Sequence, residues 1–128
     1  MSNEVQIKDN NELLREVLDE LTFHNPSILS TLVVSDDGLN VASGIPAPGD
    51  DNLALTASDL IDMAKEFGSR FEQGNLHRII LEGERRTAII MKAGKRTTLV
   101  TLITADEKLG LVSQSMRRAA ERIVAIFG

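Results

Sequence analysis

Hydrophobic and polar positions along the chain follow two rhythms, one typical of helices and one typical of strands. Apolar residues recur at helical spacing in three segments, which predicts helices at 11–23, about 50–73 and 109–127. Runs rich in Leu, Ile, Val and Thr lie between turn residues, and they predict strands at 28–35, 39–43, 76–82, 87–92 and 97–104. The predicted order of elements is therefore αββαβββα, an α+β arrangement.

The predicted strands indicate a five-stranded antiparallel sheet that is covered on both faces. Short turn segments at 83–86 and 93–96 join the last three strands into an antiparallel meander. In these strands both alternating sets of side chains are largely apolar, as in the runs 79–81 and 88–91. A strand that is apolar on both sides is buried on both sides, so we expect helices on both faces of the sheet.

The predicted helix at 50–73 is apolar over more of its circumference than one sheet can cover. At ~100° per residue its apolar positions span roughly 180°, whereas a helix lying on one sheet needs only about 100°. Small residues at Ala57, Ala64 and Gly68 would let a second surface approach closely. The pattern therefore predicts a partner surface beside the sheet.

Composition excludes several classes of protein. A length of 128 residues with 42% hydrophobic and 26% charged residues fits one globular domain, predicted at 11–128 after a flexible N-terminus at 1–10. The absence of cysteine excludes disulfides, thiolate metal sites and a thiol nucleophile. A net charge of −5 and an aromatic content of 3% argue against nucleic-acid binding. Because no long apolar segment is present, we expect a cytoplasmic protein without membrane insertion.

One glycine-containing turn resembles part of a phosphate-binding loop. Gly94, Lys95 and Thr97 have suitable residue types, but Arg96 stands where a hydroxyl residue should follow the lysine. The turn also joins two predicted strands, whereas a phosphate loop opens a helix. We interpret this segment as a hairpin turn and expect no cofactor there.

The other polar clusters do not build a catalytic or metal site. Asp36, Asp37 and Gly38 lack the alternating oxygen ligands of a calcium loop and are typical of a tight turn. Neither His24 nor His77 has a partner at helical spacing that could share a metal. Since no nucleophile motif is present either, we expect no enzyme activity, no cofactor and no metal.

Two groups of charged residues have a structural and a functional interpretation. Asp50 and Asp51 are expected to cap the helix that starts there and to complement its dipole. Basic residues at 85–86 and 95–96 lie in predicted turns, from which an arginine can reach a phosphate on a partner, as an arginine finger does in GTPases. We favour solvated turns for the second group and keep the phosphate contact as an alternative.

The order of elements resembles one protein family. The resemblance is carried by "VVSDDGLNVAS" at 33–43, the Leu- and Ala-rich middle helix, "RIILEGERRTAIIMKAGKRTTLVTLI" at 78–103 and the closing amphipathic helix. This pattern, over about 11–128, is similar to the Roadblock/LC7 family, which includes bacterial and archaeal MglB-like regulators of Ras-like GTPases. The resemblance implies a roadblock/profilin-like fold.

The resemblance also implies how the chain meets its partners. In roadblock proteins the third strand pairs antiparallel with its twin, and the middle helices lie side by side. The implied homodimer interface consists of Leu53, Ala57, Leu60, Ile61, Ala64, Phe67, Phe71, Leu76, Arg78, Ile80 and Glu82. The paired helices are implied to bind a Ras-like small GTPase, with polar contacts expected from Ser58, Asp59, Asp62 and Arg70.

The resulting hypothesis is a homodimeric regulator or scaffold of a small Ras-like GTPase, with a GTPase-activating co-regulator as one form of it. Two alternatives stay open. The first is a small-molecule sensor domain of profilin, PAS or GAF type, which also lays helices on a sheet. The second is a structural subunit of a larger assembly. The aromatic-poor interior argues against a ligand pocket.

Overall fold

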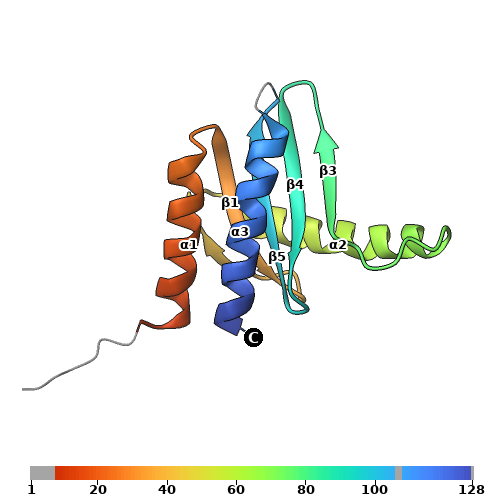
Figure 1. Cartoon of the computed structure of the whole chain (residues 1–128), viewed down its shortest axis with the longest axis horizontal. Coiled ribbons are helices and arrows are strands. Elements are labelled where there is room, and N and C mark those ends of the chain that lie inside the picture. The colour runs from red at the N-terminus through yellow and green to blue at the C-terminus, as the bar shows by residue number, and fades with distance from the viewer. Residues whose placement is uncertain (1–7, 106–107, 128) are drawn as a thin grey trace, which may run out of the picture.

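The computed structural model describes residues 8–105 and 108–127, and it confirms the predicted α+β class and order of elements (Figure 1). Within those residues the helices are α1 (Asn10–His24), α2 (Asp50–Ser69) and α3 (Leu109–Phe127). The strands are β1 (Ile28–Ser35), β2 (Asn40–Ser43), β3 (Arg78–Glu82), β4 (Arg86–Ala93) and β5 (Thr97–Thr104). Most of the N-terminal segment predicted to be flexible, residues 1–7, lies outside the described residues.

The strands form an antiparallel sheet in the order β2-β1-β5-β4-β3. The long central pair, β1 and β5, runs in register from Ser35 opposite Thr97 to Ser30 opposite Leu102. The turn between β4 and β5 contains Gly94 at a φ of 83°, a left-handed conformation that glycine adopts without strain. This confirms the hairpin turn predicted at 93–96. The strand order makes β2 and β3 the two edges of the sheet.

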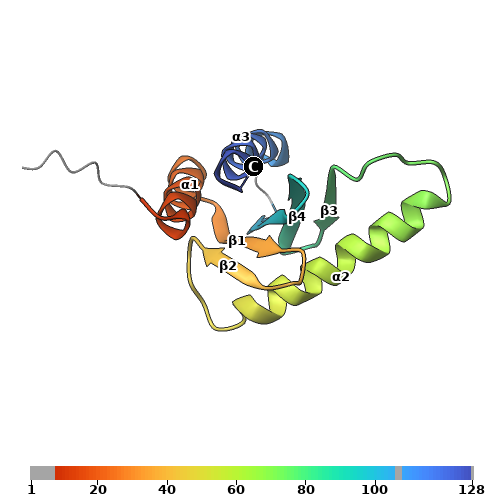
Figure 2. The same cartoon turned by 90° about the horizontal axis from the view of Figure 1, so that it is seen from below.

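Helices cover both faces of the sheet, as the sequence predicts. Figure 2 shows α1 and α3 side by side on one face and α2 on the other. Each face has its own apolar cluster, because successive residues of a strand point to opposite sides. The cluster under α1 and α3 contains Leu18, Leu99 and Met116, which are fully buried. The smaller cluster under α2 consists of Leu32, Val34, Ala54, Ala57, Ile61, Ile90 and Val100.

Polar caps fix the two ends of α1. The carboxylate of Asp9 accepts a hydrogen bond from the backbone N–H of Glu12 at 2.8 Å, so the helix begins directly after Asp9. At the other end the side-chain amide of Asn25 donates to the carbonyl of Leu21 at 2.9 Å. The helix therefore ends just before Pro26, as the sequence predicts.

The start of α2 differs from the prediction that Asp50 and Asp51 cap it. Gly49 is the residue at the N-cap, and no side chain caps this helix. Asp50 is buried, and its Oδ2 accepts hydrogen bonds from Ser43 Oγ at 2.8 Å and from Ala47 N at 3.0 Å. The capping prediction is wrong because the end of β2 and the loop after it supply donors that need a buried acceptor. Asp50 ties the end of β2 to the start of α2.

Replacing Asp50 with alanine should therefore destabilise the fold more than the same change at its exposed neighbour Asp51. We expect Asp50→Ala to lower the free energy of unfolding by about 1–3 kcal/mol, because two donors lose their acceptor in a buried site. Asp51→Ala should change it by less than about 0.5 kcal/mol. Chemical denaturation of both variants measures the difference, and equal losses would contradict the structural role of Asp50.

Candidate interaction surface

Strand β3 has one unpaired edge within the described part of the chain. It pairs with β4 along its whole length and has no other neighbour in the sheet. Backbone hydrogen bonds at the two ends of this ladder join Lys92 N to His77 O at 3.1 Å and Gly83 N to Arg86 O at 3.0 Å. Hydrogen-bonded and non-bonded pairs alternate between antiparallel strands. The residues whose backbone N–H and C=O point away from β4 are therefore Arg78, Ile80 and Glu82.

The side chains of β3 divide between the two faces of the sheet. Ile79 packs against the cluster under α2, whereas Ile80 packs against the cluster under α1 and α3. On the α3 side, Arg78 Nη1 donates to Ser113 Oγ at 3.1 Å. On the α2 side, 46% of Leu81 remains exposed. The edge strand is thus held in place on both faces, while its backbone and part of its apolar surface stay open.

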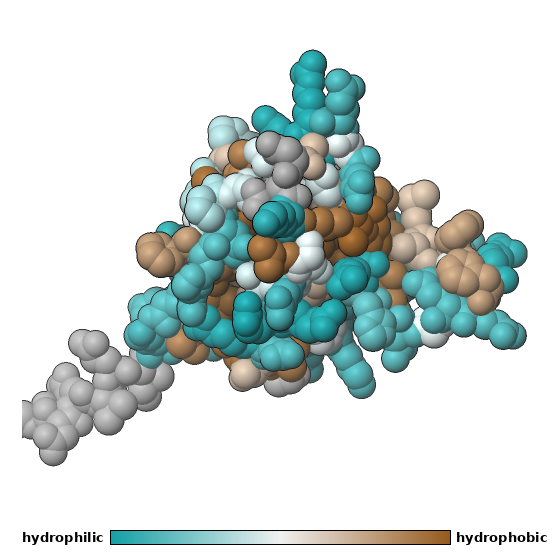
Figure 3. Space-filling model, turned by 45° about the horizontal axis from the view of Figure 1, so that its top comes forward, coloured by the Kyte–Doolittle hydropathy of each residue, from teal (hydrophilic) through white to brown (hydrophobic). Residues whose placement is uncertain are grey.

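Helix α2 reaches beyond the edge of the sheet. Figure 2 shows its C-terminal half extending past β3, and Figure 3 shows hydrophobic residues on the part of the molecule that projects there. Met63, Phe67 and Phe71, at or just after this end, are 66%, 71% and 57% exposed. The rings of Phe67 and Phe71 meet edge to face, with centroids 5.6 Å apart. Large apolar side chains therefore project where their own subunit offers little to cover them.

The predicted interface residues outside β3 fall into two groups. Ala57 and Ile61 are only 2% and 5% exposed, because they are packed against their own sheet. These two residues have little surface left for a partner. The remaining predicted residues keep at least part of their surface open, namely Leu53, Leu60, Ala64 and Leu76, which are half-buried, and the exposed Phe67 and Phe71.

A second open surface on this face was not indicated by the sequence pattern. α2 covers a row of cross-strand neighbours formed by Leu32, Val100, Ile90 and Ile79. The next row toward the β3–β4 turn, which we call the open row, consists of Ser30, Leu102, Ala88 and Leu81. Leu102 and Ala88 are half-buried, and the buried hydroxyl of Ser30 has no hydrogen-bond partner among the described residues. This row becomes visible only when strand order and register are known.

The polar residues predicted to contact a GTPase also separate. Asp59 and Asp62 are exposed on α2, and Arg70 is exposed directly after its last residue. Arg70 lies 3.9 Å from Glu66 in a solvent-exposed ion pair, which is a weak contact. Ser58 instead turns toward the β1–β2 turn, where its hydroxyl donates to the carbonyl of Asp36 at 3.4 Å. The structure therefore leaves three of the four predicted residues available on the outer side of the helix.

Burial affects Lys92, which lies on β4 close to charged residues of α2. Burial lowers the pKa of Lys92, the positive charge of Lys65 lowers it further, and Asp36 and Asp62 act in the opposite direction. The Nζ of Lys92 lies 3.8 Å from Asp36 Oδ1, and its side chain is 17% exposed. The charge at this position is therefore only partly compensated by its acidic neighbours.

Across 8–105 and 108–127, no three His, Asp or Glu side chains gather closely enough to hold a metal ion. His24 and His77 lie at the end of α1 and before β3, and the basic residues at 85–86 and 95–96 lie exposed around the two hairpin turns. In this same part of the chain no helix is both long enough and apolar enough to span a membrane.

Known proteins resemble the chain in sequence and in fold. A model of the Roadblock/LC7 domain family matches residues 14–103. An uncharacterized protein of Methanocaldococcus jannaschii is 34% identical over 116 residues, which cover 90% of this chain and 100% of the relative. The family resemblance seen in the sequence is thereby confirmed.

Solved structures of bacterial proteins share the fold. The gliding protein MglB from Thermus thermophilus superposes with a TM-score of 0.83 at 21% identity, covering 98% of this chain and 96% of that chain. A Roadblock/LC7 domain from Streptomyces avermitilis superposes with a TM-score of 0.82 at 21% identity, covering 94% of this chain and 98% of that chain. At this level of identity the likeness concerns the fold.

The lowered pKa of Lys92 gives a pH dependence that can be measured. Between that pKa and the ordinary value of 10.5, the unfolded chain binds more protons than the folded chain, so stability rises with pH. At neutral pH the wild type carries a poorly solvated charge at Lys92, so Lys92→Met should be as stable as the wild type or more stable. Any gain in stability of the variant over the wild type should shrink toward pH ~10. Urea unfolding at pH ~7 and ~10 tests this. A clear loss of stability at neutral pH would show that the Asp36 contact outweighs burial.

Proposed function

The chain belongs to the Roadblock/LC7 domain family, and we propose that it is a homodimeric regulator or scaffold that binds a small Ras-like GTPase. The observation that carries the proposal is the unpaired edge of β3 beside exposed apolar residues of α2. These residues are Met63, Phe67 and Phe71, at or just after the end of α2 that extends past β3 (Figure 2), and we call them the overhang. An exposed edge strand with apolar surface is a site for pairing with another chain. Family resemblance supplies the expected partners, which are a second copy and then the GTPase.

The outward backbone groups of β3 favour one way for two copies to pair. Antiparallel pairing about a twofold axis through Ile80 would set the outward groups of Arg78, Ile80 and Glu82 against those of the second copy. In this register Arg78 of each copy lies opposite Glu82 of the other. Opposite charges directly across two strands are favourable, and like charges there are unfavourable. The sequence of the strand is therefore complementary to itself in charge.

The same axis would place the overhang of α2 over the open row. α2 lies above the sheet at the level of Ile79, and the axis through Ile80 sets Ile79 of one copy opposite Leu81 of the other. Each α2 would then run over the partner's open row, which needs cover, with its exposed Phe67 and Phe71. Burial of apolar surface on both copies would drive the association. The two helices would lie side by side and antiparallel.

The outer side of the paired helices is the surface that we assign to the GTPase. Asp59 and Asp62 are exposed there together with Leu55, which is 51% exposed. An apolar side chain among acidic ones suits a partner that presents an apolar patch with basic residues around it. We propose that the chain arranges the GTPase and leaves the chemistry of hydrolysis to it.

Self-pairing predicts that a charge on the overhang separates the copies. We expect Phe67→Glu to give monomers, because its carboxylate would lie in the apolar contact between the helices. Phe67 is exposed within its own subunit, so the variant should fold normally. Leu39→Glu is the matched control, because Leu39 is 65% exposed in the β1–β2 turn. Light scattering measures both, and an unchanged dimer in Phe67→Glu would count against the proposed interface. Leu60→Glu and Ile80→Lys should also disrupt pairing.

The proposed register can be tested by exchanging charges. Arg78→Glu or Glu82→Arg alone should weaken the dimer by about 1–2 kcal/mol, because each change sets like charges together at two symmetric places. The double exchange should restore most of the affinity. Concentration-dependent sedimentation measures the three variants. Additive weakening in the double variant would show that the strands pair in another register.

GTPase binding is tested with a Ras-like GTPase encoded in the same genome, loaded with GDP or with a GTP analogue. Asp59→Lys and Asp62→Lys should each weaken binding by about 1 kcal/mol or more and leave the dimer intact. Asp19→Lys on α1 is the control, since Asp19 is exposed on the opposite face of the sheet. Calorimetry gives the affinities. Binding that is equally strong in all three variants would exclude the outer side of α2 as the contact.

A further inference from the structure

We propose that a second copy of this chain also docks on the layer formed by α1 and α3, on the face of the sheet opposite α2. The proposal rests on an exposed phenylalanine, a groove that matches it and a complementary order of charges on the two helices. It does not depend on pairing through β3. The two contacts lie on opposite faces, so one copy can use both at once.

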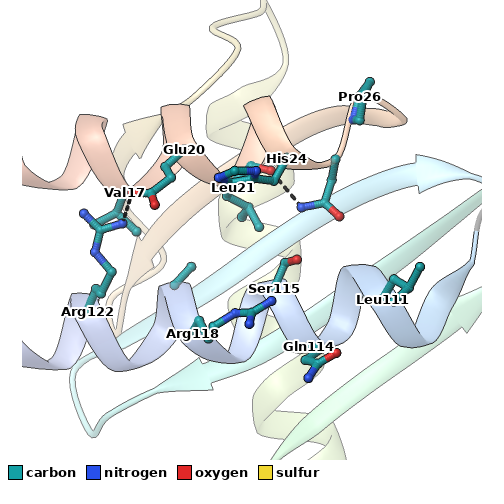
Figure 4. A pocket seen from close by; sticks show the side chains of 12 residues that line it. Val17, Glu20, Leu21, His24, Pro26, Leu111, Gln114, Ser115, Arg118 and Arg122 are labelled. Atoms are coloured by element: carbon teal, nitrogen blue, oxygen red, sulfur yellow. Dashed lines mark hydrogen bonds and ion pairs between the residues drawn. The ribbon is translucent and has the colours of Figure 1, made fainter.

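A groove of about 650 Å³ runs between the two helices. Figure 4 shows α1 and α3 running in opposite directions along it, with Ser115 and Arg118 from α3 facing the residues of α1. Ser115 and Ala119 are small and leave the helices incompletely packed, and Leu21 of α1 is the apolar residue opposite. Leu111, which is 57% exposed, lines the end of the groove nearest Pro26. The rest of the lining is largely polar and includes Glu20, His24, Gln114, Arg118 and Arg122. The groove therefore offers a projecting side chain a small apolar floor within a charged and polar rim.

Phe23 is the projecting side chain on this layer. It follows the buried Leu21 by two positions in α1, which turns it about 200° away and thus out from the sheet. It is 80% exposed, and its ring meets that of His24 edge to face with centroids 5.4 Å apart. A phenylalanine exposed to this extent is covered by little of its own subunit. It is available to enter the groove of a second copy.

The charges on the two helices are of opposite sign. The exposed residues of α1 include one arginine, Arg15, against four acids, which are Glu12, Glu16, Asp19 and Glu20. The exposed charges of α3 include one acid, Glu121, against three bases, which are Arg117, Arg118 and Arg122. Within one copy, Glu20 pairs with Arg122 and Glu16 pairs with Lys8 at the surface. Exposed ion pairs of this kind contribute little to the stability of the fold, so their side chains can pair with charges on a second copy instead.

A twofold axis parallel to the helices would lay α1 of each copy along α3 of the other. Rotation about such an axis does not change the position of any residue along the helix direction. Figure 4 shows His24 level with Ser115 and Glu20 between Arg118 and Arg122. The axis would therefore bring Phe23, next to His24, to the hollow at Ser115. Glu16, Glu20 and Phe23 are spaced along α1 as Arg122, Arg118 and Ser115 are along α3, in reverse order.

This match identifies the occupant as a second copy. Each helix layer carries both members of the contact, the ring and the hollow, the acids and the bases. A twofold contact requires self-complementarity of this kind. Because the contact consists of exposed charges around one aromatic residue per copy, we expect association to be weak and to fall steeply with added salt.

Sedimentation velocity over a range of protein concentrations, at about 50 mM and about 500 mM salt, tests the proposal. The wild-type chain should form larger species at low salt than at high salt. Phe23→Ser and Arg118→Glu should each lower the association constant on the order of tenfold, because each substitution occurs at two symmetric places in a twofold contact. The matched control is Arg117→Glu, since Arg117 is exposed on α3 but lines the hollow beside β3. It should behave as the wild type does.

Cysteine chemistry gives an independent readout, because the natural chain contains none. Phe23→Cys and Ser115→Cys are made in separate chains and mixed under mild oxidation. The mixture should form the mixed disulfide at least tenfold faster than either variant links to itself, and an intramolecular bond is impossible. Equal rates in all three samples would overturn the proposal.

The two proposed contacts can be separated experimentally. In Phe67→Glu, which is designed against the α2 contact, salt-sensitive association should persist and should still be lost on adding Phe23→Ser. Unchanged sedimentation of Phe23→Ser and Arg118→Glu, or an equal loss in Arg117→Glu, would overturn the α1–α3 contact. Neither result would bear on pairing through β3.

Discussion

One helix cannot cover one face of this sheet, and most of the open surface follows from that mismatch. A helix is about 10–12 Å across, whereas strands of eight residues are about 26 Å long. α2 crosses the strands instead of lying along them, so it buries the row from Leu32 to Ile79 and leaves the open row uncovered. Its length then carries it past β3. The opposite face has two helices lying along the strands, and together they cover the larger of the two apolar clusters (Figure 1 and Figure 2).

Most of the architecture follows from local pattern, while the surface depends on the assembled sheet. The helices at 11–23 and 109–127 and the strands at 28–35 and 97–104 lie within a residue of their predicted bounds, because their apolar periodicity is long and uninterrupted. The role of Asp50 could not be predicted correctly, since its hydrogen-bond donors come from the end of β2 and from the loop after it, whose path the sequence does not reveal.

The interaction surface shows the same limit. An apolar residue on α2 looks alike in sequence whether it packs on its own sheet, as Ile61 does, or projects into solvent, as Phe67 does. Only the width of the sheet under the helix separates them. The open row is harder still to predict, because it combines residues from β1, β3, β4 and β5. Ser58 similarly needs the position of the β1–β2 turn before its role is apparent.

The shortness of β3 affects how the chain recognises its own kind. Five residues offer few backbone bonds, and backbone bonds do not distinguish one sequence from another. If pairing is centred on Ile80, discrimination rests on the order of a positive and a negative side chain at the two ends of the strand. A related chain with the same order of charges along its third strand would form a mixed dimer with this one. A chain with like charges at both ends of that strand would pair less favourably. The charges of the edge strand would then determine which related chains in the same cell pair with one another.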